Sequence, residues 1–139
     1  MNLKINIAFV VLFSLSLYSC RIDEGEGGNV TIEGQVKHRV FYSSKVLGIK
    51  DSLISETFAI DEDVFIEYGD DKIYSDDFKT DYNGAYRFQE LTKGNYVIYA
   101  YADCDSCAGE VSPVFIEVKA AKNSAQITAP IIYLDTHIE

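Results

Sequence analysis

Tryptophan is absent from this sequence, and methionine, proline and histidine are almost absent, with one, two and two residues. Acid–base and metal centres depend heavily on histidine, and here only His38 and His137 are present. The sequence also contains neither a G-x-S-x-G nor an H-E-x-x-H motif. These absences argue against the common hydrolases and metalloproteases, so we expect a protein without catalytic activity.

Long apolar runs are missing as well, except at the N-terminus. Residues 5–17 are almost wholly apolar and follow Lys4. This run is shorter than the roughly 20 residues that a membrane-spanning helix requires, but it is typical of the core of a signal peptide. We therefore expect residues 1–19 to be a targeting segment that is removed from the mature protein.

The residues after this run, Leu17-Tyr18-Ser19-Cys20, resemble the lipobox of bacterial lipoproteins. The resemblance implies that Cys20 becomes the first residue and carries the acyl chains of a membrane anchor, in which each buried CH₂ contributes about 0.8 kcal/mol. The alternative is an ordinary secretory signal with an incidental cysteine.

Residues 20–29 are then a flexible, acidic tether. Its Arg21-Ile22-Asp23-Glu24-Gly25-Glu26 resembles the signal that directs some Bacteroidota lipoproteins to the outer face of the outer membrane. A spacer without an address is the alternative, and it leaves the periplasmic face open.

Acidic residues outnumber basic ones by 22 to 12, which gives a net charge of −10. Loss of residues 1–19 removes Lys4 and no acidic residue, so the mature chain is more acidic still. Such a charge disfavours nucleic acid and peripheral binding to anionic lipid. We expect attachment to the membrane through Cys20, and an envelope protein or a glycan as the partner.

Apolar residues alternate with polar ones through most of the remaining chain, as they do in half-buried strands. We expect a domain over residues 30–135 and a C-terminal tail over 136–139. Pro130 predicts an edge position or a bulge in the last strand. About seven closely spaced strands, with no clear long helix and no repeat, predict an all-β antiparallel sandwich. The expected strands are 30–40, 63–68, 72–75, 85–91, 96–102, 114–118 and 127–134.

Residues 41–60 lack a clear period. Roughly helical spacing is seen at Val46, Ile49, Leu53 and Ile54, although Gly48 weakens a helix by about 1 kcal/mol relative to Ala. A helix, two short strands and an ordered loop therefore all stay open for this insertion. Just before it, His38 falls on the apolar face of the first strand, where a histidine is more often a core residue than a ligand.

A family resemblance rests on four motifs: Gly34-x-Val36, Val64-x-Ile66, Thr80-Asp81-x-Asn83-Gly84-x-Tyr86-x-Phe88 and Leu91-x-x-Gly94-x-Tyr96-x-Ile98. They are similar to the carboxypeptidase-regulatory-like domain and its transthyretin-like relatives. The resemblance implies a seven-stranded Greek-key sandwich of the prealbumin type, with Tyr86, Phe88, Tyr96 and Ile98 facing the core. It implies little about function.

Within that fold, hydroxyisourate hydrolases end in Tyr-Arg-Gly-Ser and have clustered histidines. This chain ends in Asp135-Thr136-His137-Ile138-Glu139 instead, so the resemblance does not support hydrolase activity.

The two remaining cysteines form the C-x-x-C segment Cys104-Asp105-Ser106-Cys107. In an exported chain the simplest expectation is a local disulfide. Free thiols, a redox pair and half of a zinc site are the alternatives. A redox pair uses a helix N-terminus to lower the thiol pKa, and a zinc site requires further ligands that the sequence does not offer in a second pair.

Two further groups of residues are candidate ligand sites. Asp76, Asp77, Asp81 and Asn83 are the best calcium candidates in an acidic stretch, because calcium prefers several oxygen ligands; their spacing matches no EF-hand, and the alternative is a solvated cluster. Tyr99 and Tyr101, with Val97, could stack on sugar rings. The alternative is that the 41–60 insertion covers them, because a large exposed apolar patch is costly.

Overall fold

A computed structural model describes residues 24–104 and 107–139. The predicted signal peptide and the anchor residue Cys20 lie outside the described residues. Within that part of the chain there are strands but no helix, and hence no helix long and apolar enough to cross a membrane. The strands are β1 (Glu26–Ser44), β2 (Ile49–Phe58), β3 (Asp63–Tyr68), β4 (Asp76–Lys79), β5 (Ala85–Leu91), β6 (Gly94–Asp103), β7 (Val111–Ala120), β8 (Ser124–Thr128) and β9 (Ile132–Ile138).

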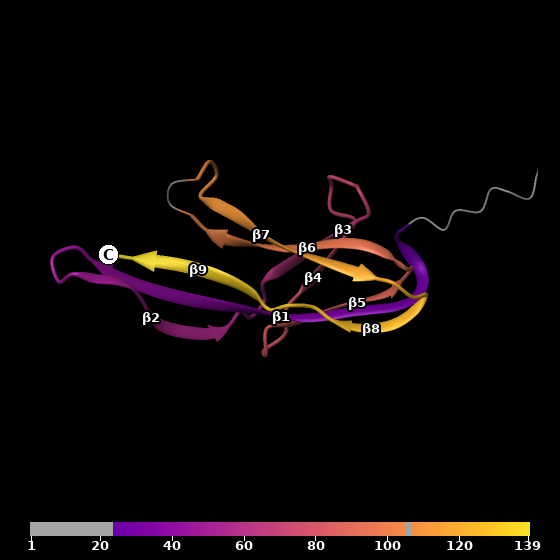
Figure 1. Ribbon diagram of the computed structural model, residues 1–139, viewed down its shortest axis with the longest axis horizontal. Coiled ribbons are helices and arrows are strands. Elements are labelled where there is room, and N and C mark those ends of the chain that lie inside the picture. Colours follow the sequence, from indigo (N-terminus) through magenta and orange to yellow (C-terminus); the bar gives the residue numbers. More distant parts are fainter. Residues whose placement is uncertain (1–23, 105–106) are drawn as a thin grey trace, which may run out of the picture.

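The strands form two facing sheets, which confirms the all-β sandwich (Figure 1). The first sheet is built on the long strand β1, with β5 and β8 beside its first half and β2 and β9 beside its second half. The second sheet has the antiparallel order β4-β3-β6-β7. One detail differs from the antiparallel expectation, because β8 and β9 run parallel to β1.

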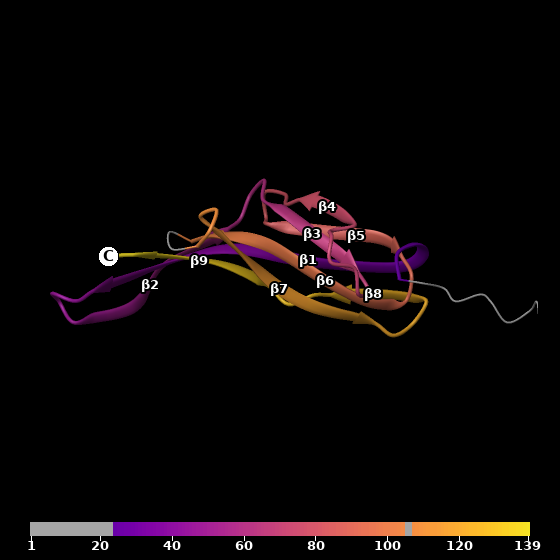
Figure 2. The same ribbon diagram turned by 90° about the horizontal axis from the view of Figure 1, so that it is seen from above.

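The insertion at 41–60 is a β-hairpin. β1 continues to Ser44, and β2 returns antiparallel beside it. Gly48 closes the connecting turn with a φ of 67°, a left-handed conformation that glycine adopts without steric cost. The hairpin extends beyond the sandwich (Figure 2). We call residues 37–58 the arm.

Two predicted strands are displaced. The strand expected at 72–75 begins instead at Asp76, after a loop in which the Ser75 amide donates a hydrogen bond to the Ile66 carbonyl (2.7 Å). The segment 127–134 is divided into the end of β8 and the start of β9. Pro130 has no N–H to donate to a sheet. Because it lies in the gap between β8 and β9, the sheet loses no hydrogen bond there.

The expectation that His38 is a core residue is wrong. Its side chain is 42% exposed, and its Nε2 lies 3.5 Å from Glu62 Oε2. Beyond Val36, β1 leaves the sandwich and enters the arm, so its alternation no longer selects a buried face.

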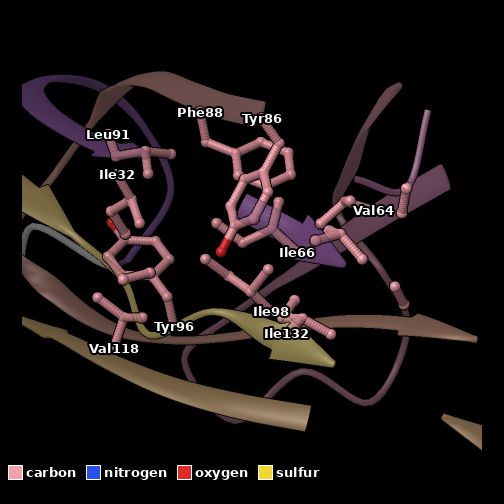
Figure 3. Packing of buried hydrophobic residues seen from close by; sticks show 14 of the residues in the cluster. Ile32, Val64, Ile66, Tyr86, Phe88, Leu91, Tyr96, Ile98, Val118 and Ile132 are labelled. Atoms are coloured by element: carbon pink, nitrogen blue, oxygen red, sulfur yellow. The ribbon is translucent and has the colours of Figure 1, made fainter. Parts of the chain in front are cut away.

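The core lies between the two sheets (Figure 3). Tyr86 and Phe88 contribute from β5, and Tyr96 and Ile98 from β6; all four are at most 3% exposed, as their motifs predicted. Tyr96 donates its hydroxyl hydrogen to the Thr92 carbonyl (2.6 Å). The Tyr86 hydroxyl, in contrast, is buried without a hydrogen-bond partner among the described residues.

The turn before β5 has the hydrogen bonds that its sequence predicts. Asp81 Oδ1 accepts from the amides of Asn83 (2.8 Å) and Ala85 (2.9 Å). Gly84 has a φ of 68° and approaches the Val36 carbonyl so closely that a Cβ would overlap it. The turn thereby holds β5 against β1.

Candidate functional site: an aromatic face

Aromatic side chains gather on the outer face of the four-stranded sheet. Phe65 on β3, Tyr99 on β6 and Phe115 on β7 are direct cross-strand neighbours. Because side chains alternate along a strand, these rings point away from the core that Ile66 and Ile98 enter. We define the aromatic face as Phe65, Tyr74, Tyr99, Tyr101 and Phe115.

The rings of the aromatic face contact one another. Tyr99 stacks on Phe65, with centroids 5.3 Å apart and planes 24° from parallel, and lies 5.2 Å from Phe115. Tyr101 meets Tyr99 edge to face at 5.6 Å. Tyr74 reaches over from the loop before β4 to contact Phe65 at 5.1 Å. Pairs of this kind contribute about 0.5–1.5 kcal/mol beyond their buried area, so the surface is held in a fixed shape.

The aromatic face has a more buried layer, Tyr99 and Phe65, which we call its floor. The more exposed rings, Tyr74, Tyr101 and Phe115, form its surface. Tyr99 is only 6% exposed, whereas Tyr101, Tyr74 and Phe115 are 41%, 50% and 55% exposed. Burial raises the pKa of the Tyr99 hydroxyl, and the neighbouring Tyr101 and Glu67 raise it further. Tyr99 is therefore neutral at physiological pH and supports the exposed rings from below.

The structure corrects the expectation that the 41–60 segment covers Tyr99 and Tyr101. That segment pairs with β1 in the other sheet, and the rings that cover Tyr99 come from its own sheet. Tyr101 stays partly open. The sequence analysis did not select Phe65 and Phe115 as site residues, because only the register of the strands places them beside Tyr99. It did not select Tyr74, because that residue lies in a loop with no alternating pattern.

Carboxylates and a disulfide border the aromatic face. Glu67, Val97 and Glu117 form the next cross-strand row. Beyond Tyr101, β6 ends in the predicted disulfide between Cys104 and Cys107, whose Cα atoms are 5.4 Å apart. The turn they close is also held by the Cys104 amide, which donates to the Glu110 carbonyl (2.8 Å). Asp105 and Ser106 lie outside the described residues.

The four calcium candidates are not brought together as a ligand set. Asp76 and Asp77 begin β4 opposite Ile66 and Phe65, whereas Asp81 uses Oδ1 to accept from two backbone amides of its own turn. Asn83 provides one of these two amides, so it is held in the same turn. Nowhere in the described part of the chain do three His, Cys, Asp or Glu side chains gather as they would around a metal ion.

A hollow of about 640 Å³ lies elsewhere, lined by residues of β1, β4, β5 and the β8–β9 connection. Its charged groups already pair with neighbours. Glu33 accepts from Arg87 Nη2 at 3.2 Å and from Gln126 Nε2 at 3.0 Å. The hollow therefore presents a satisfied polar network and exposed Phe78 and Ile131 rather than free catalytic groups.

The chemistry of the aromatic face is that of a binding surface. Its titratable groups are tyrosine hydroxyls, and apolar rings form the rest of it. Comparison with protein-family models and with curated proteins finds no match for this chain.

Proposed function

We propose that this protein is a non-catalytic, lipid-anchored β-sandwich of the bacterial outer membrane, which acts as an accessory or interaction module at the cell surface. It docks an envelope protein against the aromatic face. The observation that carries the docking surface is the exposure of Tyr74, Tyr101 and Phe115 on a fixed floor of Tyr99 and Phe65. Aromatic side chains dominate the binding energy of many protein interfaces.

The rings of the aromatic face are held rigidly by one another. Ordering a side chain on binding costs about 0.5–1.5 kcal/mol when it has many rotamers, and an aromatic ring with two χ angles costs less. Here the ring contacts already restrict Tyr101 and Phe115 before any partner arrives. The surface is therefore preorganised, and about half of the area of Tyr74, Tyr101 and Phe115 remains available.

The lipobox-like residues 17–20 support the anchor, and the acidic residues after Cys20 support the surface location. Mass analysis of the protein extracted from membranes tests this part: the proposal expects a mature chain that begins at Cys20 and carries acyl chains. A mature chain with an unmodified Cys20 would overturn the anchor.

The aromatic face is tested by exchanging its exposed rings. The Tyr101→Ser/Phe115→Ser variant should lose at least tenfold in affinity for the docked partner while it keeps the cooperative unfolding of the wild type. An Ile60→Ser/Tyr82→Ser variant, which removes two exposed apolar side chains outside both β2 and the aromatic face, is the matched control. Equal loss in both variants would show that general surface hydrophobicity, not the aromatic face, holds the partner.

A glycan is the second candidate partner. Partly exposed Tyr74 and Tyr101 offer flat ring surfaces, and the carboxylates of Glu67 and Glu117 lie in the row next to Phe65 and Phe115. Carboxylates accept hydrogen bonds from sugar hydroxyls, so the two rows together suit a saccharide. A glycan array separates the candidates: binding that depends on Tyr101 supports a glycan, and its absence leaves the protein partner.

A further inference from the structure

Three strands of the four-stranded sheet carry an aromatic residue that is followed, two positions later, by a carboxylate. They are Phe65 and Glu67 (the β3 pair), Tyr101 and Asp103 (the β6 pair), and Phe115 and Glu117 (the β7 pair). Side chains two positions apart share one face of a strand. Each carboxylate therefore lies on the same face of its strand as the ring that precedes it.

Elsewhere in the chain, a pair with this spacing already holds a guanidinium. Tyr133 and Asp135 are two positions apart on β9, and Arg39 on β1 is the cross-strand neighbour of Asp135. The guanidinium carbon of Arg39 lies 4.0 Å from the centroid of the Tyr133 ring. Its Nε and Nη2 donate to the two carboxylate oxygens of Asp135, each at 2.7 Å. The ring thus contacts the flat side of the cation, and the carboxylate binds its edge.

The β7 pair has the same components but no cation from the described part of the chain. Phe115 is 55% exposed, and Glu117 is exposed beside it. None of the ion pairs among the described residues includes Glu117. This holds even for Lys119, which follows on the same face of β7. The β7 pair is therefore open to a cation from outside.

The other two pairs are less open. In the β3 pair, the rings of Tyr74 and Tyr99 pack against Phe65 at 5.1 and 5.3 Å. In the β6 pair, Asp103 lines a hollow that Arg39 also lines, so a guanidinium of the chain itself lies near that carboxylate. Of the three pairs, the β7 pair leaves the most room for a ligand.

On the basis of the docking proposed above, we propose that the partner protein presents an arginine to the β7 pair. Its guanidinium stacks on Phe115 and forms a hydrogen-bonded ion pair with Glu117, as Arg39 does with Tyr133 and Asp135. Arginine suits this site better than lysine, because its planar fork both stacks on a ring and binds a carboxylate with two donors.

The charge of the surface favours such a partner. Glu67 lies in the same cross-strand row as Glu117, with Val97 between them, and the chain as a whole carries a net charge of −10. Complementary charge steers a cationic partner toward its site and disfavours acidic competitors. Arginine is also among the residues that dominate the binding energy of protein interfaces.

The first test uses acetyl-arginine methylamide as the probe. It is titrated into the full-length protein in detergent micelles, and NMR follows the ring resonances of Phe115. The dissociation constant should be at least threefold larger for the lysine compound and at least tenfold larger for the citrulline compound, which keeps the shape of arginine without its charge. Equal binding of the arginine and citrulline compounds, or no saturable shift, overturns the proposal.

A matched pair of variants separates the site from the net charge of the protein. Glu117→Gln keeps the shape of the side chain and should weaken binding of the arginine compound at least tenfold. Glu90→Gln removes the same charge from an exposed position on β5, outside the aromatic face, and should leave binding unchanged. Equal weakening in both variants would show attraction to net charge alone and overturns the proposal.

Photocrosslinking in intact cells of the native host separates the arginine contact from the docking itself. p-Benzoylphenylalanine in place of Tyr74 probes the aromatic face without altering the β7 pair. Its adduct should be lost from the Glu117→Gln variant and kept in the Glu90→Gln variant. An adduct kept in full in both variants overturns the arginine contact and leaves the docking intact. No adduct from the chain with neither substitution contradicts the docking, and the titration then decides on the arginine site by itself.

Discussion

Tyr99 and Phe65 lie side by side on neighbouring strands, with ring centroids 5.3 Å apart and planes 24° from parallel. Tyr99 is buried although it points away from the core between the sheets. The contact therefore creates a second, smaller apolar layer on the outer face of the four-stranded sheet. The exposed rings of Tyr101 and Phe115 pack against this layer.

The first prediction separates the floor of the aromatic face from its surface. Tyr99→Ala should lower the free energy of unfolding by about 3 kcal/mol, because it empties a buried aromatic site. Tyr101→Ala should cost less than about 1 kcal/mol, since that side chain is already 41% exposed. Urea denaturation measures both. Similar losses in the two variants would mean that Tyr99 does not support the surface.

The second prediction concerns the buried Tyr86 hydroxyl, which has no hydrogen-bond partner in the part of the chain that the structure describes. Tyr86→Phe removes an unsatisfied polar group and keeps the ring, so we expect an unchanged or higher stability, by up to about 1 kcal/mol. Tyr86→Ala should instead cost about 3–5 kcal/mol. A loss above 1 kcal/mol in Tyr86→Phe would reveal a hydrogen bond to this hydroxyl.

The third prediction is a loss of stability at alkaline pH. Burial, with smaller contributions from Asp76 and Glu26, raises the pKa of Tyr68 to about 12 from an ordinary value of 10. The unfolded chain therefore ionises first, so the contribution of Tyr68 is complete below pH 10 and is lost as the pH rises toward 12. Burial raises the pKa of Tyr86 as well.

Thermal melting between pH 9 and 12 measures this effect. The melting temperature should fall as the pH rises, and it should fall less steeply in the Tyr68→Phe variant. Parallel curves for the variant and the wild type would show that Tyr68 ionises equally in both states.

The fourth prediction compares two glycines with nearly the same backbone conformation, Gly48 and Gly84, whose φ angles are 67° and 68°. Alanine is strained at both positions by about 1–2 kcal/mol. At Gly48 its Cβ meets nothing within 4 Å, whereas at Gly84 it overlaps the Val36 carbonyl. Gly84→Ala should therefore cost about 1–3 kcal/mol more than Gly48→Ala. Equal melting temperatures would contradict the close approach of the turn to β1.

Much of the sandwich could be predicted because short-range signals determine it. The alternation in β3 and β5 gave their bounds correctly, at Asp63–Tyr68 and Ala85–Leu91. The turn at Asp81–Gly84 depends on hydrogen bonds between near neighbours. Local patterns of this kind are visible in a single sequence.

Features that depend on distant contacts could not be predicted. Thr80 is a buried polar residue because its hydroxyl donates to the Ala59 carbonyl at 2.6 Å and accepts from the Glu62 amide at 2.9 Å. The parallel pairing of β8 and β9 with β1 likewise depends on a connection across the sandwich. Neither contact has a signature in the residues next to it.

The candidate site shows the same division. The sequence placed Tyr99 and Tyr101 on one face, but it could not show which segments cover that face. The register of β3, β6 and β7 was needed to place Phe65 and Phe115 beside them. The second strand of the arm, β2, was ambiguous because its residues from Lys50 to Phe58 are exposed on both sides and therefore lack a period.

The most direct test of the proposed docking surface is site-specific photocrosslinking in intact cells of the native host. p-Benzoylphenylalanine in place of Tyr101 or Phe115 should yield one discrete adduct with an envelope protein. The same probe in place of Gln126, on β8 of the other sheet, should yield none. The absence of an adduct from both aromatic positions, or the same adducts from all three, would contradict docking at the aromatic face.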